Sequence, residues 1–121
     1  MRIALYRPEI AGNVGTILRT AACFGVACDI IEPCGFPFSL NAIKRAGMDY
    51  ADAVDLSQHA DWPHFQETVR VNSQRILLVT SKGATSLYEA EFRADDIILM
   101  GSESSGVPEF VHDAADLRLK I

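Results

Sequence analysis

The sequence has few cysteines, and no pair of histidines stands at metal-binding spacing. The cysteines form no Cys-x-x-Cys pair, and they are Cys23, Cys28 and Cys34. An odd number of cysteines without such spacing argues against a disulfide framework, so we expect reduced thiols. The histidines lack i, i+4 pairing and companion cysteines at zinc spacing, and they are His59, His64 and His112. We therefore expect no metal site.

Long apolar runs are absent as well. No stretch approaches the roughly 20 apolar residues that a membrane-spanning helix needs. The apolar opening, residues 1–6, is too short for the hydrophobic region of a secretory signal. The hydrophobic fraction of 49% is ordinary for a globular protein, and only five prolines and eight glycines interrupt the 121 residues. We expect a soluble, cytoplasmic protein with one domain over residues 1–121.

An excess of basic residues is also missing. The chain has 11 Lys and Arg against 16 Asp and Glu, which gives a formal net charge of −5. This balance is unfavourable for nucleic-acid binding, because Lys and Arg neutralise the phosphates. A local basic patch on a dimer can still bind RNA while the remaining surface is acidic.

What is present is an alternation of strand and helix patterns along the chain. Short apolar runs predict strands at residues 2–6, 27–31, 75–80, 96–100 and 117–121, with a brief one at 53–55. Apolar residues at helical spacing predict helices at 13–24, 40–46, 62–71 and 108–115. We expect Asn13 to cap the first of these helices and Gly25 to end it. The alternation implies parallel crossovers, so the predicted fold class is α/β with a doubly wound, mostly parallel sheet.

Ligands of such a sheet bind beyond the carboxyl ends of its strands, which selects three loops. They follow Tyr6, Thr80 and Met100. After the first loop, Asn13 and Arg19 lie six positions apart, about a turn and a half of helix. An arginine there can hold a phosphate by a bidentate contact beside the positive helix N-terminus. A capped helix with a solvated arginine is the simpler alternative.

The loop after Met100 is rich in glycine but matches no phosphate-binding signature. It contains neither Gly-x-Gly-x-x-Gly nor a P-loop lysine, and it lacks the nucleophile elbow Gly-x-Ser-x-Gly. By itself the pattern is typical of a tight turn. Glu103, however, stands between Gly101 and Gly106 at the end of a buried strand, where a carboxylate can fix a polar group of a ligand.

Basic and aromatic residues near predicted loops are candidates for RNA contact, and they are Lys44, Arg45, Tyr50 and Lys82. They could meet phosphates and stack a base. Scattered solubilising charges explain them equally well.

Five segments in register cover nearly the whole chain: YRPEI with GNVG and Arg19, then IEPCGF, RAGMDY, TSKG and GSESSGVP. Together they resemble the SPOUT superfamily, specifically its TrmH-like branch and the small TrmL-type enzymes that methylate the tRNA wobble nucleotide. The resemblance implies an α/β-knot fold, a homodimer and 2′-O-methylation of tRNA with S-adenosylmethionine and no metal. Family members continue past the strand that ends near Ile121 with a knot-forming segment. We therefore expect this chain to lack that segment.

The resemblance also implies roles for particular residues. Asn13, Arg19 and Glu103 fall on catalytic positions, with Arg19 acting at the ribose 2′-hydroxyl. The methyl-donor pocket falls on the following residues: Val79, Thr80, Gly101, Glu103 and Ile121. Because a guanidinium stays protonated in proteins, we expect Arg19 to position the 2′-oxygen and a phosphate instead of removing a proton.

Two other functions are possible for an α/β sheet of this kind. One is a noncatalytic nucleotide- or RNA-binding α/β domain. The other is a nicotinamide-dependent enzyme, which is disfavoured because no Gly-x-Gly-x-x-Gly follows Tyr6.

Overall fold

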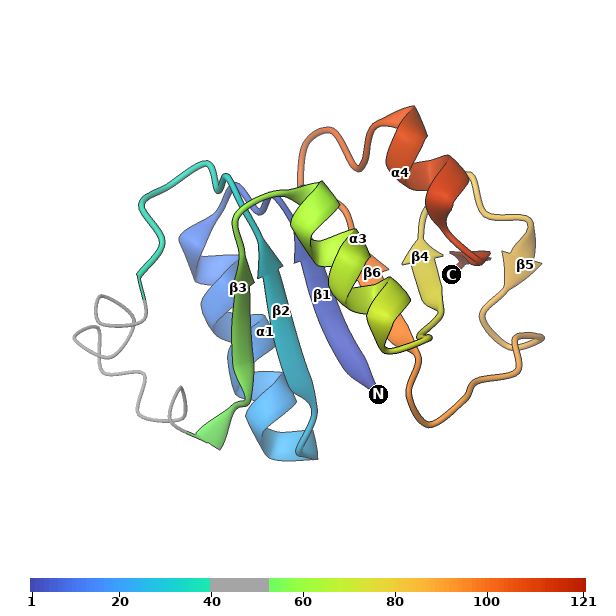
Figure 1. The fold of residues 1–121 in the computed structure, drawn as a ribbon, viewed down its shortest axis with the longest axis horizontal. Coiled ribbons are helices and arrows are strands. Elements are labelled where there is room, and N and C mark those ends of the chain that lie inside the picture. The colour runs from blue at the N-terminus through green and yellow to red at the C-terminus, as the bar shows by residue number, and fades with distance from the viewer. Residues whose placement is uncertain (40–52) are drawn as a thin grey trace.

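A parallel sheet of seven strands forms the centre of the protein, as seen in a computed structural model that describes residues 1–39 and 53–121 (Figure 1). In chain order the strands are β1 Arg2–Tyr6, β2 Ala27–Ile31, β3 Leu56–His59, β4 Ile76–Val79, β5 Thr85–Ser86, β6 Ile97–Met100 and β7 Leu117–Lys120. Across the sheet their order is β3-β2-β1-β6-β4-β7-β5, and each pair of neighbours is parallel. The predicted α/β class with a mostly parallel sheet is confirmed.

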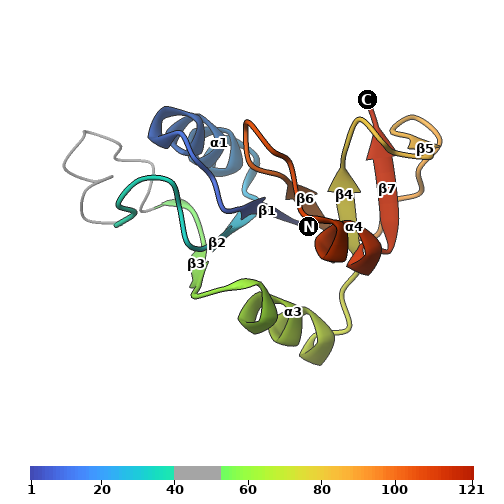
Figure 2. The ribbon, with the colours of Figure 1, turned by 90° about the horizontal axis from the view of Figure 1, so that it is seen from above.

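Three helices of the described residues cover the two faces of this sheet, and they are α1 Ala11–Phe24, α3 Trp62–Val71 and α4 Glu109–Ala114. Figure 2 shows α1 on one side of the sheet, with α3 and α4 on the other. Strands covered on both faces must be apolar on both, which is why β4 and β6 are continuous apolar runs.

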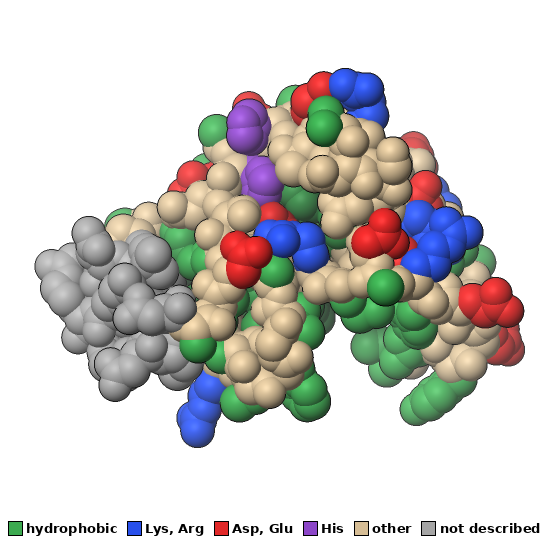
Figure 3. Space-filling view, turned by 60° about the horizontal axis from the view of Figure 1, so that its bottom comes forward, with side chains coloured by type: hydrophobic (Ala, Val, Ile, Leu, Met, Phe, Trp, Pro, Cys, Tyr) green, Lys and Arg blue, Asp and Glu red, His purple; other side chains and the backbone are tan. Residues whose placement is uncertain are grey.

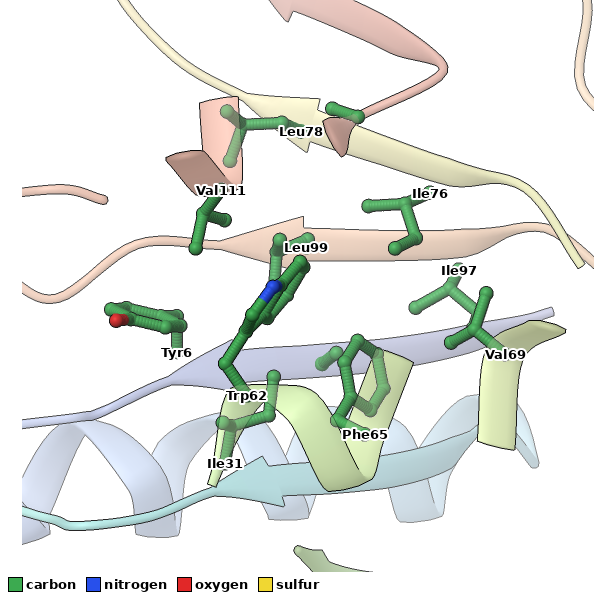
Figure 4. Packing of buried hydrophobic residues seen from close by; sticks show 12 residues of the cluster. Tyr6, Ile31, Trp62, Phe65, Val69, Ile76, Leu78, Ile97, Leu99 and Val111 are labelled. Atoms are coloured by element: carbon green, nitrogen blue, oxygen red, sulfur yellow. The ribbon is translucent and has the colours of Figure 1, made fainter. Parts of the chain in front are cut away.

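Each face therefore has its own layer of core. Under α1, the buried residues Val14, Leu18 and Ala21 pack with Leu5 and Ile30 of the sheet. On the other face, the aromatic residues of α3 dominate the packing (Figure 4). The labelled members of that cluster are Tyr6, Ile31, Trp62, Phe65, Val69, Ile76, Leu78, Ile97, Leu99 and Val111.

The sequence predicts the end of α1 correctly but not its beginning. Gly25 ends the helix in the left-handed conformation, with φ of 64°, as expected. The prediction that Asn13 caps the helix is wrong, because the helix begins two residues earlier. The carbonyl of Ile10 accepts hydrogen bonds from the amides of Asn13 and Val14, so Ile10 is the N-cap residue and Asn13 lies in the first turn.

The helix predicted at residues 62–71 is confirmed with the same bounds. Asp61 caps it by accepting a hydrogen bond from the His64 amide at 2.9 Å, and Pro63 occupies the first turn.

Other predicted boundaries need correction. The brief strand expected at 53–55 is wrong, because the strand is β3, whose first residue, Leu56, pairs with Cys28. Val54 is instead buried in the core layer under α1. The two-residue strand β5 was not predicted at all. The helix expected at residues 40–46 lies outside the described residues.

Candidate functional site

The carboxyl ends of three neighbouring strands bring distant loops together. In the register of the sheet, Met100 of β6 lies between Leu5 of β1 and Val79 of β4. The loops that follow β1, β4 and β6 therefore leave the same edge of the sheet, where ligands of parallel α/β proteins bind. These are the three loops that the sequence selects.

One cavity of about 350 Å³ lies at this edge, and we call it the strand-end cavity. Its wall comes from the ends of β4 and β6 and from the residues that follow them. Four of the five residues expected to hold the methyl donor line it, and they are Val79, Thr80, Gly101 and Glu103. The fifth, Ile121, is 81% exposed and does not line this cavity.

The bend after β6 is shaped by glycine. Ser102 and Gly106 form an antiparallel bridge in which each amide donates to the other's carbonyl, at 2.9 and 3.0 Å. A Cβ on Gly101 would lie 2.6 Å from the carbonyl carbon of Gly106, so the two backbones meet only because Gly101 has no side chain. Gly106 itself has a φ of 64°, which favours glycine.

The loop after β4 is held against β7. The Thr80 amide donates to the carbonyl of Leu119 at 2.9 Å, and the Lys82 amide donates to the Thr80 hydroxyl at 3.2 Å. A Cβ on Gly83 would lie 2.6 Å from the carbonyl carbon of Leu119, which requires glycine here as well. Lys82, one of the residues expected to contact RNA, is exposed and follows Ser81, which lines the strand-end cavity.

A second cavity of about 440 Å³ lies beside the first, and we call it the loop cavity. It is enclosed by the loop after β1, the loop after β2 and the bend after β6, with Glu9, Cys34 and Gly106 in its wall. The Gly35 amide donates to the carbonyl of Pro8 at 2.9 Å, which joins the first two of these loops.

The loop after β1 and the bend after β6 are joined through Glu9, which the sequence did not single out as a site residue. Its carboxylate accepts hydrogen bonds from the amide and the hydroxyl of Ser104, and its own amide donates to Glu103 at 2.7 Å. The Ser104 hydroxyl and amide lower the pKa of Glu9 from its ordinary value. No signal in the sequence identifies this contact, because it depends on β1 and β6 being neighbours in the sheet.

Asn13 and Arg19 are exposed on α1, and neither lines the strand-end cavity or the loop cavity. Six residues turn an α-helix through about 600°, so these two side chains leave the helix about 120° apart and do not share one side. The other residues expected to contact RNA lie outside the described residues, and they are Lys44, Arg45 and Tyr50. The roles of all these residues remain predictions.

Charges on the described surface are mixed. In the face that Figure 3 shows, the basic side chains are scattered and most of them lie near acidic ones, so its described part has no continuous basic area. Within residues 1–39 and 53–121, no three His, Cys, Asp or Glu side chains gather in a way that could hold a metal ion. The described helices include none that is long and apolar enough to cross a membrane.

Comparison with known proteins places this edge of the sheet in context. The model of the SpoU rRNA Methylase family matches residues 1–121. A tRNA (cytidine(34)-2'-O)-methyltransferase of Beijerinckia indica is 48% identical over 119 residues, which are 98% of this chain and 74% of the relative. The protein of the same name from Ancylobacter novellus is 43% identical over 121 residues, all of this chain and 77% of the relative.

Solved structures are similar over the same length. One, which gives structural insights into the 2-OH methylation of C/U34 on tRNA, superposes with a TM-score of 0.89 at 42% identity and covers 99% of this chain and 78% of its own. An AdoMet-bound rRNA methyltransferase from Sinorhizobium meliloti has a TM-score of 0.84 at 26% identity, and the match covers 99% of this chain and 46% of that one.

Proposed function

Because this chain belongs to the SpoU rRNA methylase family, we propose that it transfers a methyl group from S-adenosylmethionine to the ribose 2′-hydroxyl of a tRNA. The proposed target is the wobble nucleotide, position 34, as in the names of its relatives. The observation that carries the proposal is the strand-end cavity, whose wall combines four of the residues expected to hold the donor.

The strand-end cavity suits S-adenosylmethionine in size and in chemistry. Its volume of about 350 Å³ lies within the range of roughly 300 to 1,000 Å³ that small-molecule sites occupy. The glycine bend lets the backbone approach a ligand closely, which suits an adenine and a ribose. A nearby carboxylate, Glu103, favours a positively charged ligand. Bound there, S-adenosylmethionine supplies an electrophilic methyl group.

The side chains of the protein then position the acceptor. We propose that the guanidinium of Arg19 holds the attacking 2′-oxygen and a neighbouring phosphate through its planar fork. Asn13 orients the same nucleotide from the first turn of α1, and Lys82 contacts phosphate beside the cavity. Holding the reacting groups in line supplies much of the acceleration.

A homodimer and a cytoplasmic location complete the proposal. Arg19 lines neither cavity of its own chain, so a second copy that brings an α1 helix to the strand-end cavity would complete the site. Sedimentation of the protein with and without tRNA measures whether it is a monomer or a dimer. A monomer in both conditions would contradict the dimer.

The deciding experiment is incubation of the protein with labelled S-adenosylmethionine and total tRNA, followed by mapping of the methylated nucleotide. We expect label on the ribose of position 34. Binding of S-adenosylmethionine without transfer would instead indicate the noncatalytic nucleotide- or RNA-binding domain. Absence of both binding and transfer would exclude the proposed function.

The role of Arg19 has its own test. Arg19→Lys keeps the positive charge but loses the fork, so we expect turnover to fall by roughly tenfold or more. The matched control is Arg70→Lys, which changes an exposed arginine of α3 that pairs with Glu67. Full turnover in the Arg19→Lys protein would exclude the proposed positioning role.

A further inference from the structure

Two loops that are far apart in the sequence are fastened to each other by hydrogen bonds in both directions. The Ser104 amide donates to Glu9 Oε1 at 3.0 Å, and the Ser104 hydroxyl lies 2.7 Å from Oε1 and 2.9 Å from Oε2. In return, the Glu9 amide donates to Glu103 Oε2 at 2.7 Å. We call these three residues, Glu9, Glu103 and Ser104, the reciprocal clamp.

Each half of the clamp pairs a carboxylate of one loop with a backbone amide of the other. Hydrogen bonds to an ionised carboxylate are shorter and stronger than those between neutral groups. Because both loops contribute an acceptor and a donor, neither loop can shift along the other without breaking contacts in both halves. The clamp therefore fixes both the distance between the loop after β1 and the bend after β6 and the way in which one lies along the other.

The clamp crosses the boundary between the two cavities. Glu9 lines the loop cavity, whereas Glu103 lines the strand-end cavity. The bend itself is a wall of both, since Ser102, Gly106 and Val107 line the two cavities in common. A displacement of the bend would change both cavities together.

On the other side, the clamp reaches the helix that carries the predicted catalytic residues. Glu9 immediately precedes Ile10, whose carbonyl accepts the first hydrogen bonds of α1. The clamp thus joins the bend after β6 to the start of α1, a helix that core packing already holds in place.

We propose that Glu9 and Ser104 are positioning residues for methyl transfer, which hold the bend after β6, a wall of the methyl-donor cavity, in one position on the first loop. This inference rests on the proposed function. Misplacing reacting groups by about 1 Å can cost on the order of a hundredfold in rate. Loosening the clamp should therefore lower turnover although neither side chain touches the reacting atoms.

The clamp is separate from the packing that holds the fold. Glu9 and Ser104 are both exposed, and neither belongs to the core layers. The helix α1 is anchored independently by Val14, Leu18 and Ala21. Variants of the clamp should accordingly fold and melt like the parent protein.

The test compares Glu9→Ala, Ser104→Ala and the double variant in methyl transfer to tRNA. We expect kcat to fall by roughly tenfold in Glu9→Ala while KM for tRNA and donor changes by less than about twofold, because positioning acts on the transition state. Since the two residues act as one unit, the double variant should be no slower than Glu9→Ala. Glu9→Gln keeps an acceptor oxygen and should restore most of the turnover. Glu67→Ala removes another exposed, hydrogen-bonded carboxylate and is the matched control.

Amide hydrogen exchange separates failure of the clamp from failure of the proposed function. The Ser104 amide should be protected in the parent protein and exchange faster in Glu9→Ala. A parent protein whose Ser104 amide is unprotected would exclude the clamp, whatever the activity. If the Ser104 amide is protected in the parent but Glu9→Ala has a normal kcat, the positioning role is excluded. Losses of kcat that add up in the double variant would exclude it as well. A parent protein that neither binds the donor nor transfers methyl would overturn the proposed function and this role with it, while protection would still establish the contact.

Discussion

Glycines let backbone segments approach each other more closely than any side chain would permit at the carboxyl edge of the sheet. Gly101 faces the backbone of Gly106, and Gly83 faces the backbone of β7. Both contacts are with main-chain atoms, which cannot rotate away as a side chain can. The course of the bend after β6 therefore depends on Gly101, and that of the loop after β4 depends on Gly83.

We predict that Gly101→Ala destabilises the protein by about 1–3 kcal/mol, the usual cost of forcing an extra methyl group into a packed site. The new Cβ would lie 2.6 and 2.7 Å from main-chain atoms of Gly106, so the bend must move. Urea unfolding measures the change. The matched control is Gly12→Ala in the first turn of α1, where an added Cβ meets no described atom within 4 Å. It should be neutral or stabilise slightly. Equal unfolding midpoints for Gly101→Ala and the parent would contradict the expectation.

The cysteines differ in reactivity for reasons that can be measured. Burial, and next the charge of Asp29, raises the pKa of Cys28 to about 11. Burial, then Glu32 and Glu103, raises the pKa of Cys34 to about 11 as well. At pH 8 only roughly one in a thousand of either thiol is ionised.

We therefore predict that iodoacetamide at pH 8 modifies the exposed Cys23 first. Peptide mapping by mass spectrometry gives the order. The same reaction in urea is the control, since all three cysteines should then react at similar rates. Labelling of Cys34 as fast as Cys23 in the native protein would show that its thiol is not protected in this way.

Among the helices and strands, those with a strong local pattern were predictable and those defined by distant pairing were not. The helix α3 follows from Phe65 and Val69 at helical spacing with Pro63 in its first turn, and β4 follows from its aliphatic run. The edge strand β3 has the mixed sequence Leu-Ser-Gln-His, which carries no clear pattern. The strand β5 exists only through its pairing with β7.

The same distinction applies to the candidate site. Gly101 and Glu103 could be identified because they follow a buried aliphatic strand, where ligands of parallel sheets bind. The contact of Glu9 with Ser104 could not, because it depends on which strands become neighbours. That β1 and β6 lie side by side is a property of the sheet order and not of either segment.

The cap of α3 offers a prediction about a whole helix. Replacing Asp61 by alanine removes the acceptor for the His64 amide and should destabilise the protein by about 1 kcal/mol. Asp61→Asn retains a capping oxygen and should remain close to the parent. Denaturant unfolding of the three proteins distinguishes them. Equal losses for alanine and asparagine would show that the charge of Asp61, and not its capping oxygen, stabilises α3.

For the molecule as a whole, two opposite edges of the sheet are held by different chemistry. At the carboxyl edge the reciprocal clamp joins exposed loops. At the amino edge, the carboxylate of Asp96 is fully buried and accepts hydrogen bonds from the guanidinium of Arg75 and from the Arg93 amide. The backbone carbonyl of Asp96 accepts a hydrogen bond from the Arg2 amide. These contacts join the starts of β1, β4 and β6, the three strands whose other ends lie at the strand-end cavity.

At the scale of the whole molecule, the predicted SPOUT relationship is confirmed by the family match over the full chain and by the parallel sheet.

Acid should reduce the stability that the contacts of Asp96 at the amino edge contribute. Hydrogen bonds from Arg75, assisted by the Arg93 amide, lower the pKa of Asp96 below its ordinary value. A carboxylate whose pKa is lower in the folded than in the unfolded protein stabilises the fold above the unfolded value, and this contribution disappears as the pH falls through the folded value. We predict that Asp96→Asn lowers the unfolding midpoint in urea at pH 7. The gap to the parent should narrow as the pH falls below about 4, because Asp96 then takes up a proton more readily in the unfolded chain than in the folded protein. Asp95→Asn is the matched control, since it changes an exposed carboxylate at the adjacent position. A gap that is constant from pH 7 to about pH 3 would mean that the ionised carboxylate of Asp96 is not what holds this edge together.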